Sequence, residues 1–522
     1  MCRRCACLSL LLVPLLATLL IACAGEDQGA TPPRTATTAT ATPTSSPATG
    51  TLKVGVWAEV FGTGSCLNTY YDLGARVIGC QPDGFVGLTV GGPLEQEGRR
   101  WWAIAGQGWA NEEFLRYHHE GPPPWPQRSE LRGAGKIAFA APDGLWLMNA
   151  DGSEKRKLAD LSLEMNQPIS WSPQGDKIAF ATPDGLWLMN ADGSEKRKLA
   201  DVSLGRDHRI SWSPQGDKIA VGLAFPSPGG RILVLDLDAH LLLEIPEAGR
   251  PSWSPRGDLL AYAAGGDFIR IVDLQGRVLR EIANSLPPFF WSPDGRKISF
   301  AQRVGEAEPI PLIAAVVLDL ETGQRWDVDP GSASAFTDLP LFSPDGRWVA
   351  YGDRLIDADT RAERPLPGLS AAWSPDGRFL ILFILFHDQG NPWGIYDVGQ
   401  ESLVMTFDPG LYGSAAAWEW ARFFHWSEDG SHLVFGWFHP SEDADRTGVG
   451  FIDLDQMKFY MVSARSPGGI ALSPDGQYLV FSNSLETPDG SILGPWLWVV
   501  DMDGSNLTLL TEGSQPAWQP RP

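Results

Sequence analysis

Three histidines near the end of the chain, His425, His432 and His439, are spaced seven residues apart, and imidazole is a frequent zinc ligand. In the strand pattern described below, they fall at the end of one strand, the start of the next and the start of a loop. We therefore expect their side chains to point in different directions. The segment 501–506 (DMDGSN) begins like a calcium-binding loop but lacks that loop's later ligands. The sequence predicts neither a bound metal nor a cofactor.

Aromatic and acidic residues gather instead on predicted loops in the last third of the chain. Binding residues are often carried by loops that a rigid scaffold holds in place. The candidate binding residues are Trp393, Trp418, Trp420, Asp443 and Asp445. The alternative is that the tryptophans pack in the core between repeated units. The chain has no Gly-x-Ser-x-Gly nucleophile motif.

The first residues have the layout of an export signal. Arg3 and Arg4 precede an apolar run, 8–22, which is shorter than the ~20 residues that span a bilayer as a helix. The run ends LIAC, which resembles the bacterial lipobox, and this resemblance implies cleavage before Cys23 and attachment of lipid to that cysteine. The alternatives are an ordinary signal peptide with a stray cysteine and an uncleaved anchor.

Two cysteines remain beyond this leader. The segment 23–50 is rich in Thr, Ala, Pro and Ser and has no large apolar side chain, so we expect a disordered tether. Cys66 and Cys80 then form an even pair in an exported chain, which predicts a disulfide. Two buried thiols are the alternative.

A repeat begins after the first quarter of the chain. The 25 residues from Lys136 (KIAFAAPDGLWLMNADGSEKRKLAD) return from Lys177 with one change, Thr182 in place of Ala141. A shorter motif, WSPQGDKIA, starts at Trp171. Related motifs start at Trp212, Trp253, Trp291, Phe342, Trp373, Trp426 and Leu472. A spacing of 31 to 53 residues is typical of a repeat array.

Each unit contains four strand-sized segments joined by short turns. Ser-Pro-Asp-Gly suits a tight turn after the first strand, and Asp-Gly suits the hairpin turn between the third and fourth. Four antiparallel strands every ~40 residues predict the blade of a β-propeller. We count nine second strands, starting at Lys136, Lys177, Lys218, Leu259, Lys297, Trp348, Phe379, His432 and Tyr478. Nine blades follow, or eight if the short unit from Phe342 merges with a neighbour.

The two ends of the array complement each other. The first unit lacks a first strand, and the last residues (SQPAWQPRP) contain an aromatic residue with no second strand after it. We expect residues 517–519 to complete the first blade and to cover its edge. The short turns should then lie on one face of the ring, the tight-turn face. The long loops should lie on the opposite face, the loop-rich face.

The repeated motif resembles the TolB-like, or WD40-like, family of propeller repeats over residues 136–519. The resemblance implies the propeller. It does not imply TolB's partner, the peptidoglycan-associated lipoprotein, because a different small domain precedes these repeats.

That small domain, 51–118, has short alternating segments broken by glycine-rich turns, which predicts a small β-barrel. The order of its motifs resembles the bacterial Src-homology-3 (SH3) family. These motifs are Gly62–Asn68, Gly79–Gly84, Gly92-Pro93, Trp101-Trp102, Gly108-Trp109 and Glu113–Leu115. Tyr70 and Tyr71 are candidates for a ligand groove with the tryptophans, and packing of the tryptophans in the barrel core is the alternative.

The sequence thus predicts an all-β protein in five parts. They are a signal peptide (1–22), a tether (23–50), the SH3-like domain (51–118), a proline-rich linker (119–131) and the propeller (132–522). The net charge of −22 argues against nucleic acid as a partner. We expect a non-catalytic lipoprotein on the outer side of a bacterial cell membrane. It would bind a protein, peptide or cell-envelope component through the loop-rich face. The alternative function is a propeller hydrolase or lyase with carboxylates at the channel mouth.

Overall fold

The computed structural model describes residues 51–521, apart from 65, 71–76, 84–85, 105–107, 121–128, 132, 161–168, 203–209, 224–229, 266, 306–311, 333–339, 385–392, 408–420, 439–446, 464–468, 487–491 and 503–504. Two 3-10 helices, η1 (Glu112–Phe114) and η2 (Ser129–Leu131), are the only helices among these residues. No helix in this part of the chain is long and apolar enough to cross a membrane. The fold is all-β.

The first seven strands along the chain form one antiparallel sheet, with the strand order β3-β2-β6-β5-β4-β1-β7. Its strands are β1 (Val56–Val60), β2 (Cys66–Tyr70), β3 (Val77–Pro82), β4 (Val86–Gln96), β5 (Arg99–Ile104), β6 (Gly108–Asn111) and β7 (Leu115–Glu120). Trp101, Trp102 and Trp109 are 5%, 2% and 1% exposed. Trp102 packs with Val60 and Leu115 of this sheet, which is the core role that the sequence left open beside a ligand groove. Trp101 also lines a pocket of about 200 Å³. The assignment of this sheet to the SH3-like family stays a prediction.

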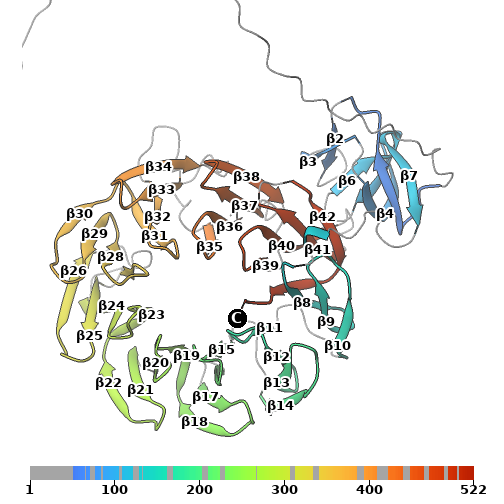
Figure 1. Ribbon diagram of the computed structural model, residues 1–522. Helices are drawn as coiled ribbons and strands as arrows, with labels where there is room; N and C mark the ends of the chain where they lie inside the picture. The colour runs from blue at the N-terminus through green and yellow to red at the C-terminus, as the bar shows by residue number, and fades with distance from the viewer. Residues whose placement is uncertain are drawn as a thin grey trace, which may run out of the picture. The chain divides into compact units, whose positions relative to one another are not determined.

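Nine four-stranded antiparallel sheets follow in the described part of the chain, and Figure 1 shows them arranged as blades around a ring. The first strand of a blade lies on the inside of the ring and the fourth on the outside. Blades 1 to 3 are β43 (Ser514–Trp518), β8 (Lys136–Ala141), β9 (Gly144–Asn149), β10 (Arg156–Ala159); β11 (Ile169–Trp171), β12 (Lys177–Thr182), β13 (Gly185–Asn190), β14 (Arg197–Ala200); and β15 (Ile210–Trp212), β16 (Lys218–Leu223), β17 (Arg231–Asp236), β18 (Leu241–Pro246).

Blades 4 to 6 are β19 (Ala248–Trp253), β20 (Leu259–Ala264), β21 (Phe268–Asp273), β22 (Val278–Ile282); β23 (Ser285–Trp291), β24 (Lys297–Gly305), β25 (Leu312–Asp319), β26 (Arg325–Ser332); and β27 (Leu341–Phe342), β28 (Trp348–Tyr351), β29 (Arg354–Asp357), β30 (Glu363–Pro365). Blades 7 to 9 are β31 (Leu369–Trp373), β32 (Phe379–Phe383), β33 (Trp393–Asp397), β34 (Ser402–Phe407); β35 (Ala421–Trp426), β36 (His432–Phe438), β37 (Thr447–Asp453), β38 (Lys458–Ser463); and β39 (Gly469–Leu472), β40 (Tyr478–Glu486), β41 (Ile492–Asp501), β42 (Thr508–Glu512).

The tail of the chain completes the first blade, as the sequence predicted. β43 pairs with β8, with Ala517 opposite Ala138 and Trp518 opposite Ile137. The Trp518 indole N–H donates to the carbonyl of Ala134 at 2.5 Å. The backbone amide of Gln519 donates to the carbonyl of Lys136 at 2.8 Å. The unit from Phe342 forms a separate sheet, β27–β30, so the count among the described residues is nine rather than eight.

The repeated tryptophan links neighbouring blades as well as filling space. In four blades its indole N–H donates to a carbonyl just before the corresponding aromatic residue of the preceding blade. These bonds join Trp171 to Ala517 (3.0 Å), Trp253 to Ser211 (3.1 Å), Trp291 to Ser252 (3.4 Å) and Trp373 to Leu341 (3.1 Å). The apolar clusters also lie between blades. One cluster, for example, joins Ile219 of blade 3 to Leu188 of blade 2. The core of the propeller is therefore a series of contacts between blades.

The turn after the first strand exists in two chemical forms. In the SPDG form, the Ser292 hydroxyl donates to Asp294 within the turn at 2.5 Å. In the SPQGD form, the Ser172 hydroxyl reaches Asp176 instead, at 2.7 Å. Gln174 takes the place of the acid within the turn, and its side-chain amide donates to the backbone carbonyl of Gln215 in the next blade, at 2.9 Å. Moving the acid by two positions thus converts a turn that closes on itself into a link between blades.

Candidate binding site

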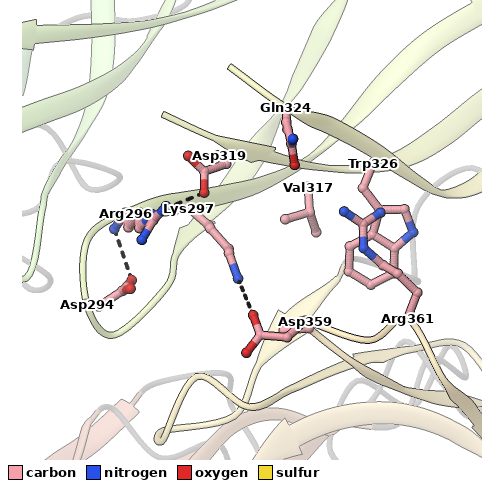
Figure 2. A pocket seen from close by; sticks show the side chains of 10 residues that line it. Asp294, Arg296, Lys297, Val317, Asp319, Gln324, Trp326, Asp359 and Arg361 are labelled. Carbon is pink, nitrogen blue, oxygen red and sulfur yellow. Dashed lines mark hydrogen bonds and ion pairs between the residues drawn. The ribbon is translucent and has the colours of Figure 1, made fainter. Parts of the chain in front are cut away.

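A polar pocket of about 380 Å³ lies between blade 5 and blade 6. Its residues come from the β23–β24 turn, from the β25–β26 hairpin and from the β29–β30 turn, all of which belong to the tight-turn face. The pocket is lined by Asp294, Arg296, Lys297, Val317, Asp319, Gln324, Trp326, Ala358, Asp359 and Arg361. Figure 2 shows the side chains that line it.

The two blades that flank this pocket differ greatly in size. β24, β25 and β26 of blade 5 have nine, eight and eight residues. β28, β29 and β30 of blade 6 have only four, four and three. Val317, Trp326 and Ala358 belong to one apolar cluster between these blades. The extra length of blade 5 lies at the loop-rich end of its strands, whereas the pocket lies at the tight-turn end, beside this cluster.

One wall of the pocket is built from turn residues that are already hydrogen-bonded. The Arg296 side chain donates from Nε to Asp319 Oδ2 at 3.1 Å, and Glu321 lies 3.2 Å from the same nitrogen. Asp319 Oδ1 accepts from the backbone amides of Glu321 and Thr322 at 3.0 and 2.8 Å. The Asp319 side chain is only 14% exposed. Arg296 is therefore held by carboxylates of its own blade.

The carboxylates of this wall are stabilised in their charged form. Burial alone would raise the pKa of Asp294, but hydrogen bonds from the Ser292 hydroxyl and the Arg296 amide outweigh it and lower the pKa. Burial likewise opposes ionisation of Asp319, and its pKa is nevertheless lowered by Thr322 and Arg296. Both carboxyl groups therefore act as fixed anions and hydrogen-bond acceptors near neutral pH.

The other cations of the pocket have looser partners. Lys297 Nζ lies 3.3 Å from Asp359 Oδ1 across the gap between the blades, and the Asp359 side chain is 89% exposed. The Lys297 side chain is 22% exposed, so only the acid of this pair lies at the surface. The Arg361 guanidinium carbon lies 4.3 Å from the centre of the Trp326 ring. In Figure 2, Lys297 extends toward Asp359 while Arg361 lies against Trp326.

The backbone of blade 6 directs Arg361 toward blade 5. Arg361 has a φ of 65°, in the left-handed region, and its amide donates to the Asp357 carbonyl at 2.9 Å. Asp357 Oδ1 accepts from the amides of Asp359 and Thr360, and the Thr360 bond is the largest cause of the lowered pKa of Asp357. The turn is thus locked by its own acid, and it presents a stacked guanidinium to the pocket.

The residues singled out from the sequence lie elsewhere. Trp393 is 4% exposed and packs against Phe383 and Phe424, with ring centroids 5.3 and 5.1 Å away. It therefore has the packing role that the sequence left open, between blades 7 and 8. Trp418, Trp420, Asp443, Asp445, Tyr71 and Cys23 lie outside the described residues. Tyr70 is described only through its backbone pairing with Trp109 and with Val77.

The cysteines and histidines can be placed in part. Cys66 lies opposite Pro82 and Cys80 opposite Asn68, so the two cysteines are diagonal neighbours on β2 and β3. Their side chains are outside the described set, and the disulfide stays a prediction. His425 is exposed, whereas His432 is 9% exposed and lies 2.7 Å from the Ser431 hydroxyl. Among the described residues, no group of three potential metal ligands comes together.

Sequence reasoning missed the pocket because its residues sit in turns that repeat through the array. Lys297 and Asp359, which meet across the pocket, are 62 positions apart. The unequal spacing of the repeats on either side of Phe342 gave no signal for the pocket, because the extra length of blade 5 lies on the loop-rich face.

Comparisons with known proteins support the fold and go no further. No protein-family profile and no curated protein sequence matches the chain. A crystal structure of the eukaryotic initiation factor is 13% identical, with a TM-score of 0.51, and the match covers 74% of this chain and 99% of that one. At this identity the likeness concerns the fold alone.

Two further solved structures match with lower TM-scores. Oligogalacturonate lyase from Vibrio parahaemolyticus is 13% identical, with a TM-score of 0.39 and coverage of 62% of this chain and 94% of that one. Dihydro-heme d1 dehydrogenase NirN is 16% identical, with a TM-score of 0.40 and coverage of 66% and 76%.

Proposed function

We propose that the protein is an exported, lipid-anchored binding protein. In this proposal Cys23 carries the anchor, residues 23–50 form the tether, and the propeller holds a protein, peptide or cell-envelope component through its loop-rich face. The SH3-like domain at 51–118 would contribute a second contact with the same partner.

The observation that carries the proposal is the difference in hairpin length on the loop-rich face. In blade 2 the pairing of β12 with β13 runs from Lys177–Asn190 to Thr182–Gly185. In blade 5 the pairing of β24 with β25 continues to Gly305–Leu312, and in blade 9 that of β40 with β41 continues to Glu486–Ile492. Blades 5 and 9 therefore extend paired arms where the duplicated blade ends in a tight turn.

These arms are suited to contact with a partner. Val304, at the end of the blade 5 arm, is 43% exposed despite its apolar side chain. Arg303 beside it lies 3.4 Å from Asp267 of blade 4, so the arm is supported at its base. Binding residues are often carried by loops and hairpins that a rigid scaffold supports.

Shortening one arm tests the binding proposal. Residues 304–312 are replaced by Asn-Gly, which forms a two-residue hairpin between the paired residues Arg303 and Ile313. Purified full-length protein is immobilised, and the amount of each envelope component retained from an extract is measured. We expect the shortened chain to retain at least about tenfold less of its main ligand, since each tenfold loss corresponds to about 1.4 kcal/mol of contact.

The matched control places the same Asn-Gly turn in the duplicated blade, in place of Pro183-Asp184, and should retain the ligand fully. Equal retention by the shortened and control chains would contradict the role of the loop-rich face. No specific retention by the native chain would contradict the binding function itself.

The anchor is tested separately with Cys23→Ala. Several acyl chains give firm membrane attachment, so the native protein should partition into the detergent phase and the variant into the aqueous phase. Mass spectrometry of the mature amino terminus identifies the lipid. An unmodified Cys23 would exclude the lipoprotein assignment without affecting the binding proposal.

A further inference from the structure

We infer that the pocket between blades 5 and 6 binds the carboxylate of a small polar ligand between Lys297 and Arg361. This site lies on the tight-turn face, opposite the arms, and it does not depend on the proposed function. Its volume of about 380 Å³ falls within the range of about 300–1,000 Å³ for small-molecule sites.

The cations of the pocket are not equally available to a ligand. Arg296 is bonded to Asp319 and Glu321 of its own blade. Lys297 has an exposed carboxylate as its partner, Asp359, at 3.3 Å. The Asp359 side chain is 89% exposed, so it can turn into solvent and leave the Lys297 ammonium group to a ligand.

Arg361 supplies a second, better oriented cation. Its guanidinium carbon lies over the Trp326 ring, 4.3 Å from the ring centre, and this cation–π contact holds the group at the pocket. The N–H donors lie in the guanidinium plane. A carboxylate matches this planar fork with two parallel hydrogen bonds. The left-handed backbone at Arg361, together with the bond from its amide to Asp357, fixes where the fork emerges.

The charge of the walls favours a carboxylate over a phosphate group. Asp294, Asp319 and Asp359 also line the pocket, and the first two are held in their ionised form. A phosphate ester carries about 1.5 to 2 negative charges at neutral pH and would be repelled more strongly than a carboxylate with one charge. Gln324, also on the wall, adds an amide that can pair with a hydroxyl or amino group.

The test is calorimetric titration of the full-length protein with three probes. Free glutamate and the α-amide of N-acetylglutamate share the side-chain carboxylate. The first probe represents a free amino acid and the second a residue within a peptide. Inorganic phosphate is the third probe. We expect at least one carboxylate to bind and phosphate to bind at least about tenfold more weakly. The stronger of the two carboxylates identifies the source of the ligand.

Substitutions distinguish this site from other anion binding. Lys297→Met and Arg361→Gln should each weaken carboxylate binding at least about tenfold. Arg364→Gln is the matched control, since Arg364 is also stacked on a tryptophan, Trp348 at 4.6 Å, but is paired with Glu401 at 2.6 Å and lies outside the pocket. The control should leave the affinity unchanged.

Asp359→Asn gives a result of opposite sign. Removing the acid that competes for Lys297 should tighten carboxylate binding about two- to fivefold, whereas a purely structural role would weaken binding or leave it unaltered. Three results would overturn the inference: none of the probes binds, phosphate binds as tightly as the carboxylates, or Asp359→Asn weakens carboxylate binding or leaves it unaltered.

Discussion

Blade 1 and blade 2 share 25 residues, 136–160 and 177–201, that differ only at Ala141 and Thr182. Both copies form the same three strands with the same register, so that Lys136 faces Asn149 and Lys177 faces Asn190. They differ in where the remaining strand originates. Blade 2 uses β11, which directly precedes its copy, whereas blade 1 uses β43 from the end of the chain. A blade thus requires a strand of the right pattern at its inner edge, and chain continuity is not needed.

The neighbours of the two copies also differ. Lys155 of blade 1 donates to Thr511 of blade 9 at 2.6 Å, and burial there lowers the pKa of Lys155. Arg197 of blade 2 donates through Nε to the Leu237 carbonyl of blade 3 at 2.8 Å. Lys155 and Arg197 are different positions of the repeat, with Lys196 and Arg156 as their equivalents. Each contact shows a side chain of the shared sequence that bonds to a residue supplied by the adjoining blade.

The one substitution changes the hydrogen bonding of a tryptophan. In blade 1, Trp146 donates to Asp143 at 2.8 Å. In blade 2, Trp187 donates to the Thr182 hydroxyl at 3.0 Å, and that hydroxyl donates to Asp184 at 2.5 Å. The Thr182 hydrogen bond, followed by Lys198, lowers the pKa of Asp184 to about 2. One hydroxyl therefore converts a direct contact into a chain of two.

Removing the tail should have the largest effect on this comparison. A chain ending at Gly513 loses the inner strand of blade 1, whereas blade 2 keeps its own. Trp518 is 6% exposed, and loss of a buried tryptophan alone costs about 3–5 kcal/mol. We expect the free energy of unfolding in urea to fall by at least that amount.

Arg521→Gln provides the control for this deletion. Arg521 forms a surface pair with Asp475 at 3.1 Å, so the free energy of unfolding should change by less than about 0.5 kcal/mol. A shortened chain as stable as the native one would mean that β43 does not contribute to blade 1.

Substituting the repeated tryptophan by phenylalanine should have an intermediate effect. Trp171→Phe removes the indole N–H that donates to Ala517 of the borrowed strand. Trp212 occupies the same position in blade 3, but its buried Nε1 has no hydrogen-bond partner among the described residues. Since a net hydrogen bond contributes about 0.5–1.5 kcal/mol, Trp171→Phe should destabilise the protein by that much more than Trp212→Phe. Equal losses in urea unfolding would show that the indole contributes only through packing.

Much of the fold was readable from the sequence because blade strands repeat at regular spacing. An aromatic residue before Ser-Pro marked the end of most first strands, and the incomplete first and last units predicted the pairing of β43 with β8. The sequence did not decide between eight and nine blades, because it did not show whether the unit from Phe342 forms a blade of its own. Strands as short as β27, with two residues, are too short for a sequence pattern to identify.

The site could not be predicted in the same way. Lys297 and Asp359, or Trp326 and Arg361, meet only after two blades have packed together, and periodicity within a blade contains no information on that contact. Trp393 illustrates the converse problem. It begins β33 directly after a long predicted loop, so its sequence position suggested a loop residue, whereas packing between blades buries it.

Exchanging Ala141 and Thr182, the one position that differs between the two copies, should have the smallest effect on the protein. Thr182→Ala removes the hydrogen bond that contributes most to the lowered pKa of Asp184, so this pKa should rise from about 2 toward the ordinary value of 3.8. Ala141→Thr should lower the pKa of Asp143 further. Carbon-detected NMR titration of the aspartate carboxyl groups measures both.

The sign of the accompanying stability change follows from the direction of the shift. A carboxyl group with a lowered folded-state pKa stabilises the fold above its unfolded pKa and loses this contribution as the pH falls through the folded value. For Asp184 this contribution is lost between about pH 4 and pH 2. Thr182→Ala should narrow this pH range, because it raises the folded-state pKa toward the ordinary value. If the pKa of Asp184 is unchanged in Thr182→Ala, the Thr182 hydroxyl does not cause the lowered pKa.

The closed ring is tested most directly by a disulfide between its two ends. Ala138 and Ala517 are directly opposed in β8 and β43, a position in which Cβ atoms lie about 4.5–5.5 Å apart. Under mild oxidation, Ala138→Cys with Ala517→Cys should form a cross-link that mass spectrometry identifies as one joined peptide. Ala141→Cys with Ala517→Cys, displaced by three residues or about 10 Å along β8, should not. Failure of the first pair to cross-link, or equal cross-linking by both pairs, would contradict closure of the ring by the tail strand.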